Sequence, residues 1–160
     1  MPRCDPSSLV SLLSSRGLTM SAAESCTGGL IGATITSVPG ASAVFLGSAV
    51  TYSNSAKVSL LGVSEDTLVS HGAVSTETAR EMAMGAVRAF SSDVSVAVTG
   101  IAGPGGAVPG KPVGTVCIAV SDGCRTIASR FAFDGDRDAV RTSTVAEAVA
   151  MLYDMVEGVL

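Results

Sequence analysis

The spacing of apolar residues changes several times along the chain, and each change predicts a secondary-structure element. Asp5-Pro6 has the form of an N-cap followed by proline at the first helical position, and apolar residues then recur at helical spacing until Gly17. Residues 18–22 predict a short strand. After a polar turn, residues 30–38 predict a second helix that ends before Pro39-Gly40.

The middle of the chain predicts a strand followed by helices. Residues 44–52 are apolar enough for a buried strand, and Ser53 is placed to cap a short helix. Ser64 and Ser75 are expected to cap two further helices. Between residues 76 and 90 the apolar side chains form a stripe at helical spacing, which makes this helix the strongest local prediction.

The last part of the chain predicts three more strands. Residues 94–99 predict a buried strand, and the following loop, 100–112, is too rich in glycine and proline for regular structure. Residues 113–120 and 126–133 predict two strands joined around Asp122-Gly123, a dipeptide typical of β-hairpins.

A long C-terminal helix completes the pattern. Asp136 opens it, and its apolar positions continue to Val156. Together the elements predict an α/β fold, a three-layer α/β/α sandwich with a mixed, partly antiparallel sheet. The 160 residues fit one ordinary domain, so we expect a single domain over residues 1–160.

Composition and charge narrow the class of protein. Hydrophobic residues make up 47% of the chain and charged residues 15%, which indicates a compact protein with few charges to cover its surface, and we expect a homo-oligomer. The net charge is -4 without any Lys/Arg run, which disfavours nucleic acid as a partner. The apolar runs are too short for a membrane span and the first residues lack a signal-peptide pattern, so we expect a cytoplasmic protein.

The four cysteines and the single histidine do not form a metal-ligand pattern. Cys4, Cys26, Cys117 and Cys124 are widely separated, and only His71 could assist them. We therefore expect no metal and no cofactor, with reduced, mostly buried thiols. His71 stands before Gly72, which favours a place at a helix C-terminus rather than a catalytic role.

A polar segment lies where the first predicted strand meets the second predicted helix. It contains Glu24, Ser25, Thr27, Gly28 and Gly29. Unpaired backbone N–H groups and the helix dipole at such a turn favour an anion or oxyanion, and the glycines allow a ligand to approach the backbone. Spacing alone favours a simpler interpretation, in which Ser25 or Thr27 caps the helix and the glycines serve packing.

The segment after the second predicted strand carries a phenol, an amide and an amine. These belong to Tyr52, Asn54 and Lys57. Taken alone the lysine could be an ordinary exposed residue, but a lysine that is desolvated beside a serine can lose its charge and act as a general base. A Ser-Lys hydrolase needs this chemistry when no histidine lies in its site.

Two further segments could contact a nucleotide. Thr99, Gly100 and Gly103 belong to a loop with the glycine density of a phosphate cradle, although it lacks the ending of a Walker motif and the order of a Rossmann fingerprint. Arg137 and Arg141 stand one helical turn apart and could point together at a phosphate or carboxylate. The loop could instead be a flexible connection, and the arginines could instead form local ion pairs.

In combination these segments are specific. From about residue 18 to 149 the chain closely resembles the CinA C-terminal domain family, through AAESCTGGLIGATIT, VTYSNSAK, GVSEDTL, HGAVS, TGIAGPGG, KPVGTV and GDRDAVR in this order. The family includes stand-alone nicotinamide mononucleotide deamidases, and also longer proteins with an N-terminal molybdopterin-binding-like domain. We do not expect that extra domain within these 160 residues, because they are too few to contain it.

The resemblance implies an activity and the residues that perform it. The expected reaction is hydrolysis of the carboxamide of nicotinamide mononucleotide to nicotinic acid mononucleotide and ammonia, in pyridine nucleotide recycling. Ser25 resembles the family's nucleophile and Lys57 its base, with Tyr52 and an arginine of GDRDAVR as further site residues. The chain departs from many relatives after Gly103, where PGGAVPGKPVG lacks their acidic or polar residue.

Two alternatives remain open at this point. The chain could be a catalytically silent mononucleotide-binding or interaction module, in which no bond is broken. It could also be a cysteine amidase that uses Cys26, since a thiol at a helix N-terminus can have a lowered pKa. The resemblance favours Ser25.

Overall fold

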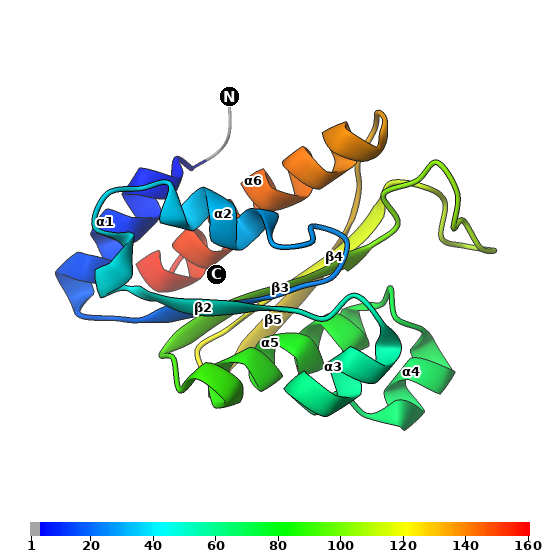
Figure 1. Ribbon diagram of the computed structural model, residues 1–160, viewed down its shortest axis with the longest axis horizontal. Coiled ribbons are helices and arrows are strands. Elements are labelled where there is room, and N and C mark those ends of the chain that lie inside the picture. The colour runs from blue at the N-terminus through cyan, green and yellow to red at the C-terminus, as the bar shows by residue number, and fades with distance from the viewer. Residues whose placement is uncertain (1–3) are drawn as a thin grey trace.

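The computed structural model describes residues 4–160, and a five-stranded sheet forms its centre (Figure 1). The strand order is β2-β1-β3-β4-β5. The strands are β1 (Met20–Glu24), β2 (Phe45–Val50), β3 (Val94–Gly100), β4 (Thr115–Ser121) and β5 (Thr126–Ala132). β1 pairs in parallel with β2 and β3, whereas β3–β4 and β4–β5 are antiparallel, which confirms the mixed sheet.

Helices cover both faces of the sheet, as predicted (Figure 1). One layer contains α1 (Pro6–Arg16), α2 (Leu30–Thr36) and α6 (Arg137–Glu157), and the other contains α3 (Asn54–Leu61), α4 (Glu65–His71) and α5 (Thr76–Phe90). A 3-10 helix, η1 (Ala41–Ala43), precedes β2 and was not expected from the apolar pattern. The architecture is therefore a three-layer α/β/α sandwich.

The ends of the helices follow the predicted caps. Asp5, Ser53, Ser75 and Asp136 each accept a hydrogen bond from a backbone N–H of the first helical turn. Ser64 occupies the N-cap position of α4 without a side-chain hydrogen bond. These caps place the helix starts within one residue of the predictions.

The first predicted strand starts later than the sequence suggested. Leu18 N–H donates to Leu13 O (2.9 Å), so this residue still completes the C-terminal turn of α1. The strand instead runs from Met20 through Glu24. Residues 1–3, on which the expectation of no signal peptide partly rests, lie outside the described residues.

Apolar side chains fill the space on each side of the sheet. Leu9, Ile31 and Leu152 belong to the cluster on the side of α1, α2 and α6, and Leu61 and Met82 to the cluster on the side of α3 and α5. Within residues 4–160, no helix is long and apolar enough to cross a membrane.

The order of the strands creates a switch point at one edge of the sheet. The chain passes from β1 through α2 to β2, and then through α3, α4 and α5 to β3 on the other side of β1. All three parallel strands end at the same edge, and ligands of open α/β sheets bind outside such ends where the strand order reverses. The polar segments that follow these strands therefore lie close together.

Candidate active site

A cavity of about 270 Å³ lies at the carboxyl ends of β1, β2 and β3. Its polar lining comes from Ser25, Tyr52, Lys57, Thr99 and Arg137. A larger hollow of about 440 Å³ beside β3 and α6 is lined by apolar side chains, two aspartates and Cys124, and it contains none of the site residues that the sequence predicted. The smaller cavity is therefore the candidate active site.

The centre of the cavity is a contact between Lys57 and Ser25. Lys57 lies on the inner face of α3 and is 1% exposed. Its Nζ lies 2.9 Å from Ser25 Oγ and donates a hydrogen bond to Thr51 O (2.7 Å). Burial lowers the pKa of Lys57, because removal from water disfavours the ammonium form. A serine hydroxyl beside an amine whose pKa is lowered is the arrangement of an activated nucleophile.

Cys26 lies beside the same pair, but the pKa of its side chain is shifted in the opposite direction from that of Lys57. It is 6% exposed, and burial raises the pKa of its thiol to about 11. The thiol therefore stays protonated at neutral pH, even though Cys26 lies shortly before the N-terminus of α2, where the pKa of a thiol can be lowered. Because the thiolate is the nucleophilic form, this environment weighs against a cysteine amidase.

Glu24, expected to bind substrate, does not line the cavity and needs a correction. Its side chain is fully buried under the start of α2. Ser48 Oγ donates to its Oε2 (2.7 Å) from the neighbouring strand β2. The remaining donors come from the turn and α2, namely Thr27 Oγ1 and the N–H groups of Gly29, Ile31 and Gly32. Glu24 therefore satisfies the unpaired N–H groups of the helix start.

The backbone of this turn offers two free N–H groups. Gly28 N–H donates to Ser25 O (3.1 Å), and Gly29 N–H donates to the buried carboxylate (3.2 Å). Within residues 4–160, the N–H groups of Cys26 and Thr27 donate to no other residue. Of the backbone N–H groups in this turn, those of Cys26 and Thr27 are therefore the ones that an oxyanion could meet, whereas those of Gly28 and Gly29 are already engaged.

The end of β3 forms another wall. A Cβ atom at Gly100 would lie 2.7 Å from Val116 Cγ2 and 3.2 Å from Cys26 Sγ, so only glycine lets the strand approach this closely. Thr99 Oγ1 donates to Ala73 O (2.8 Å) and fixes a segment that also lines the cavity. The sequence predicted Thr99 and Gly100 for the site, but it carried no signal for Ala73, which contributes its backbone carbonyl.

The two arginines of α6 have different surroundings. Arg137 lines the cavity, and its guanidinium donates to Gly103 O (2.8 Å) and to Tyr52 Oη (3.4 Å). Tyr52 is 66% exposed at the mouth. Arg141 instead contacts the backbone of the turn after β1. Asn54 is exposed and does not line the cavity.

The sequence of this chain is similar to proteins of a known family. Residues 6–156 match the model of the CinA C-terminal domain. The chain belongs to this family. A putative competence-damage inducible protein of Symbiobacterium thermophilum is 49% identical over 97% of the chain, and a CinA-like protein of Chlorobaculum tepidum is 54% identical over 81%. The chain spans about a third of the length of these curated relatives (38% and 32%).

Solved structures of the family share the fold. The competence/damage inducible protein CihA from Agrobacterium tumefaciens has a TM-score of 0.89 at 41% identity, with 96% of each chain covered. A competence-damaged protein (CinA) superfamily protein from Klebsiella pneumoniae has a TM-score of 0.91 at 33% identity, with 97% of this chain and 99% of that chain covered. The fold is thus that of the CinA superfamily.

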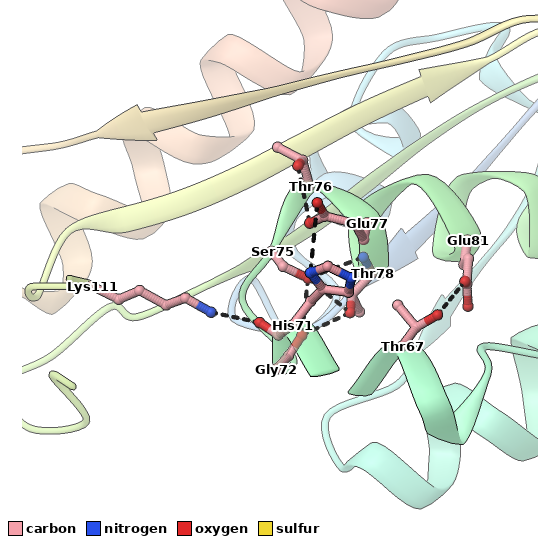
Figure 2. Close-up of polar contacts among 9 residues, drawn as sticks. All are labelled: Thr67, His71, Gly72, Ser75, Thr76, Glu77, Thr78, Glu81 and Lys111. Atoms are coloured by element: carbon pink, nitrogen blue, oxygen red, sulfur yellow. Dashed lines mark hydrogen bonds and ion pairs between the residues drawn. The ribbon is translucent and has the colours of Figure 1, made fainter. Parts of the chain in front are cut away.

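A second polar cluster lies at the junction of α4 and α5 (Figure 2). His71 is the last residue of α4, as predicted, and its Nδ1 lies 3.7 Å from Glu77 Oε1. Lys111 Nζ donates to His71 O (2.7 Å), which ties the loop after β3 to α4. His71 does not line the candidate active site. Three of the four cysteines are buried and all four are free.

Proposed function

We propose that this chain is a nicotinamide mononucleotide deamidase, which hydrolyses the carboxamide to nicotinic acid mononucleotide and ammonia. The observation that carries the proposal is the 2.9 Å contact between Ser25 Oγ and Nζ of a lysine that is 1% exposed. Membership of the CinA C-terminal domain family agrees with it. A chemically idle lysine would gain stability from reaching water, so its burial against a serine points to catalysis.

In the first step, Ser25 attacks the carboxamide carbon. Neutral Lys57 takes the proton from Ser25 Oγ, and the carbonyl oxygen becomes an oxyanion that Cys26 N–H and Thr27 N–H can stabilise. The tetrahedral intermediate then collapses. The C–N bond breaks, the Lys57 ammonium gives its proton to the departing nitrogen, and ammonia leaves an acyl ester on Ser25.

In the second step, water releases the acid. Lys57, neutral again, takes a proton from water, and the resulting hydroxyl attacks the ester carbon. The C–O bond to Ser25 breaks and Ser25 Oγ recovers the proton from Lys57. The products are nicotinic acid mononucleotide and the free enzyme. No step needs a metal, because lysine and the backbone supply the base and the oxyanion donors.

The remaining cavity residues would bind the rest of the nucleotide. Arg137 offers its guanidinium at the cavity mouth, where it can meet the phosphate. Tyr52 lies beside it and can contact the substrate from the same side. The loop from Thr99 to Gly103 can follow the ribose. We further propose that the domain works in the cytoplasm as a homo-oligomer, in agreement with its low content of charged residues.

A product assay tests the proposal. The purified chain is incubated with nicotinamide mononucleotide and a chelator, and ammonia and nicotinic acid mononucleotide are measured. We expect equal amounts of both products, and none with Ser25→Ala. Binding of the nucleotide without ammonia release would favour a silent mononucleotide-binding module. Loss of activity in chelator with recovery on adding zinc would contradict the metal-free mechanism.

A further inference from the structure

We propose that Arg141 is a positioning residue, which orients the peptide groups of the turn after Ser25 as an oxyanion hole and does not bind the substrate phosphate. This inference rests on the proposed function and deepens it. It assigns different tasks to two arginines that stand one helical turn apart on α6.

The guanidinium of Arg141 is directed at the backbone of the turn. Its Nε donates to Cys26 O (3.2 Å), and its Nη2 donates to Thr27 O (3.1 Å). Its Nη1 lies 3.7 Å from Asp138 Oδ1 on the same helix. The side chain is only 30% exposed. A phosphate bound by Nε would have to displace the Cys26 carbonyl, so the contacts with the turn leave Arg141 less free than Arg137 for a phosphate.

These contacts fix the direction of the N–H groups on the far side of the peptides. In a planar trans peptide the C=O and the following N–H point in opposite directions. Because Cys26 O points at Arg141, Thr27 N–H points away from it, and this N–H is one of the two without an acceptor. Thr27 O also accepts from Leu30 N–H (3.1 Å), so the same carbonyl joins the arginine to the start of α2.

The turn needs such a tether. Gly28 and Gly29 both have positive φ angles, 59° and 104°, and glycine leaves the backbone free to take other conformations. Arg141 holds the carbonyls of the peptides on both sides of Thr27, and the second of these peptides adjoins the glycines. Without these contacts, a rotated Cys26–Thr27 peptide would present a carbonyl oxygen in place of its N–H donor and repel the oxyanion. Donors that are held before the reaction contribute most to catalysis, because they need no reorganisation.

Arg137 presents the contrasting case. It lines the cavity and is exposed at its mouth, where it lies next to Tyr52. Its contacts, Gly103 O and Tyr52 Oη, belong to the rim rather than to the turn. The two arginines should therefore affect different kinetic constants.

Steady-state kinetics of matched variants test this division. Arg141→Lys keeps the charge but cannot bridge two carbonyls in one plane, Arg137→Lys is its counterpart, and Arg125→Lys on the exposed β4–β5 turn is the control. We expect Arg141→Lys to lower kcat by about tenfold to hundredfold with KM changed by less than about threefold. Arg137→Lys should mainly raise KM.

Two ligands separate the ground state from the tetrahedral state. The first is the product, nicotinic acid mononucleotide, which should bind Arg141→Lys as it binds the wild type and thereby shows that the variant is folded. The second is the 3-formylpyridine analogue of the substrate, whose aldehyde can add Ser25 Oγ to give a tetrahedral hemiacetal. Its affinity for Arg141→Lys should fall by the same factor as kcat.

Two outcomes would overturn the positioning role of Arg141. A raised KM and weaker product binding in Arg141→Lys, with kcat retained, would overturn it by showing a phosphate ligand. If Arg141→Lys cannot bind product, amide hydrogen exchange of Arg141→Gln decides the question. Faster exchange at Gly28 and Leu30, whose N–H groups donate within the turn, supports the tether, and unchanged exchange overturns it. This exchange needs no substrate, so it stays informative even if the wild type fails to hydrolyse nicotinamide mononucleotide, which would refute only the proposed function.

Discussion

Lys57 Nζ lies 2.9 Å from Ser25 Oγ, although the two residues follow different strands. Ser25 comes directly after β1, and Lys57 lies on α3, which follows the neighbouring strand β2. The pair forms because β1 and β2 run in parallel and end at the same edge of the sheet. The capped first turn of α3 then directs Lys57 inward, where burial lowers its pKa. The fold thus places a serine hydroxyl beside a lysine with a lowered pKa, a combination that neither residue provides alone.

The first prediction separates Ser25 from its neighbour Cys26. Ser25→Ala should lower kcat by about a thousandfold or more while product binding is retained, because the nucleophile is lost and the cavity remains. Cys26→Ala should keep most of the activity, because a thiol with a pKa raised to about 11 is not the attacking group. Kinetics of the two variants check this, and the reverse order of damage would favour the cysteine amidase.

The second prediction concerns the pH dependence of the rate. A free lysine titrates near pH ~10.4, and burial lowers the pKa of Lys57 in the folded protein. Lys57 is protonated and inactive as a base below its folded pKa and neutral above it, so kcat/KM should rise with pH through the lowered value. A profile that stays flat up to the ordinary lysine range would contradict a lysine base.

The third prediction concerns stability and uses the same lowered pKa. Between the folded pKa of Lys57 and about 10.4, the unfolded state binds more protons than the folded state, so the free energy of unfolding should rise with pH through this window. Lys57→Met lacks this contribution. Urea unfolding of both proteins at several pH values measures the difference, and parallel pH curves would show that the folded lysine is not perturbed.

The fourth prediction tests the corrected role of Glu24. Glu24→Gln replaces one acceptor oxygen by an amide donor that faces the N–H and hydroxyl donors around it. We expect a loss of about 2–4 kcal/mol in unfolding free energy. Thermal unfolding should show this as a lower Tm, with the exposed Glu65→Gln on α4 as the control. A variant as stable as the wild type would restore Glu24 as a candidate ligand.

Local structure was largely predictable because its signals are local. The cap at Ser75 and the apolar stripe over residues 76–90 predicted α5 with the correct bounds. Hairpin chemistry at Asp122-Gly123 likewise predicted the pairing of β4 with β5. The strand order could not be obtained in this way, since it depends on how helices between β1, β2 and β3 cross the sheet.

The site was predictable only in part. The resemblance to the family pointed to Ser25 and Lys57, whereas spacing alone favoured a capped helix start. The contacts of Glu24 and Arg141 could not be predicted, because polar residues near a turn resemble ligands until their tertiary partners are known. Ser48 for Glu24, and the Cys26 and Thr27 carbonyls for Arg141, are such partners.

The most direct test of the Ser-Lys mechanism is the turnover of Lys57→Arg with nicotinamide mononucleotide. Arginine preserves the positive charge but keeps its proton, so it cannot act as a base. We predict that kcat falls by about a hundredfold to ten-thousandfold, nearly as far as in Lys57→Met, while product binding shows that the cavity remains intact. Near-normal turnover in Lys57→Arg would show that residue 57 supplies only charge, and would contradict the mechanism.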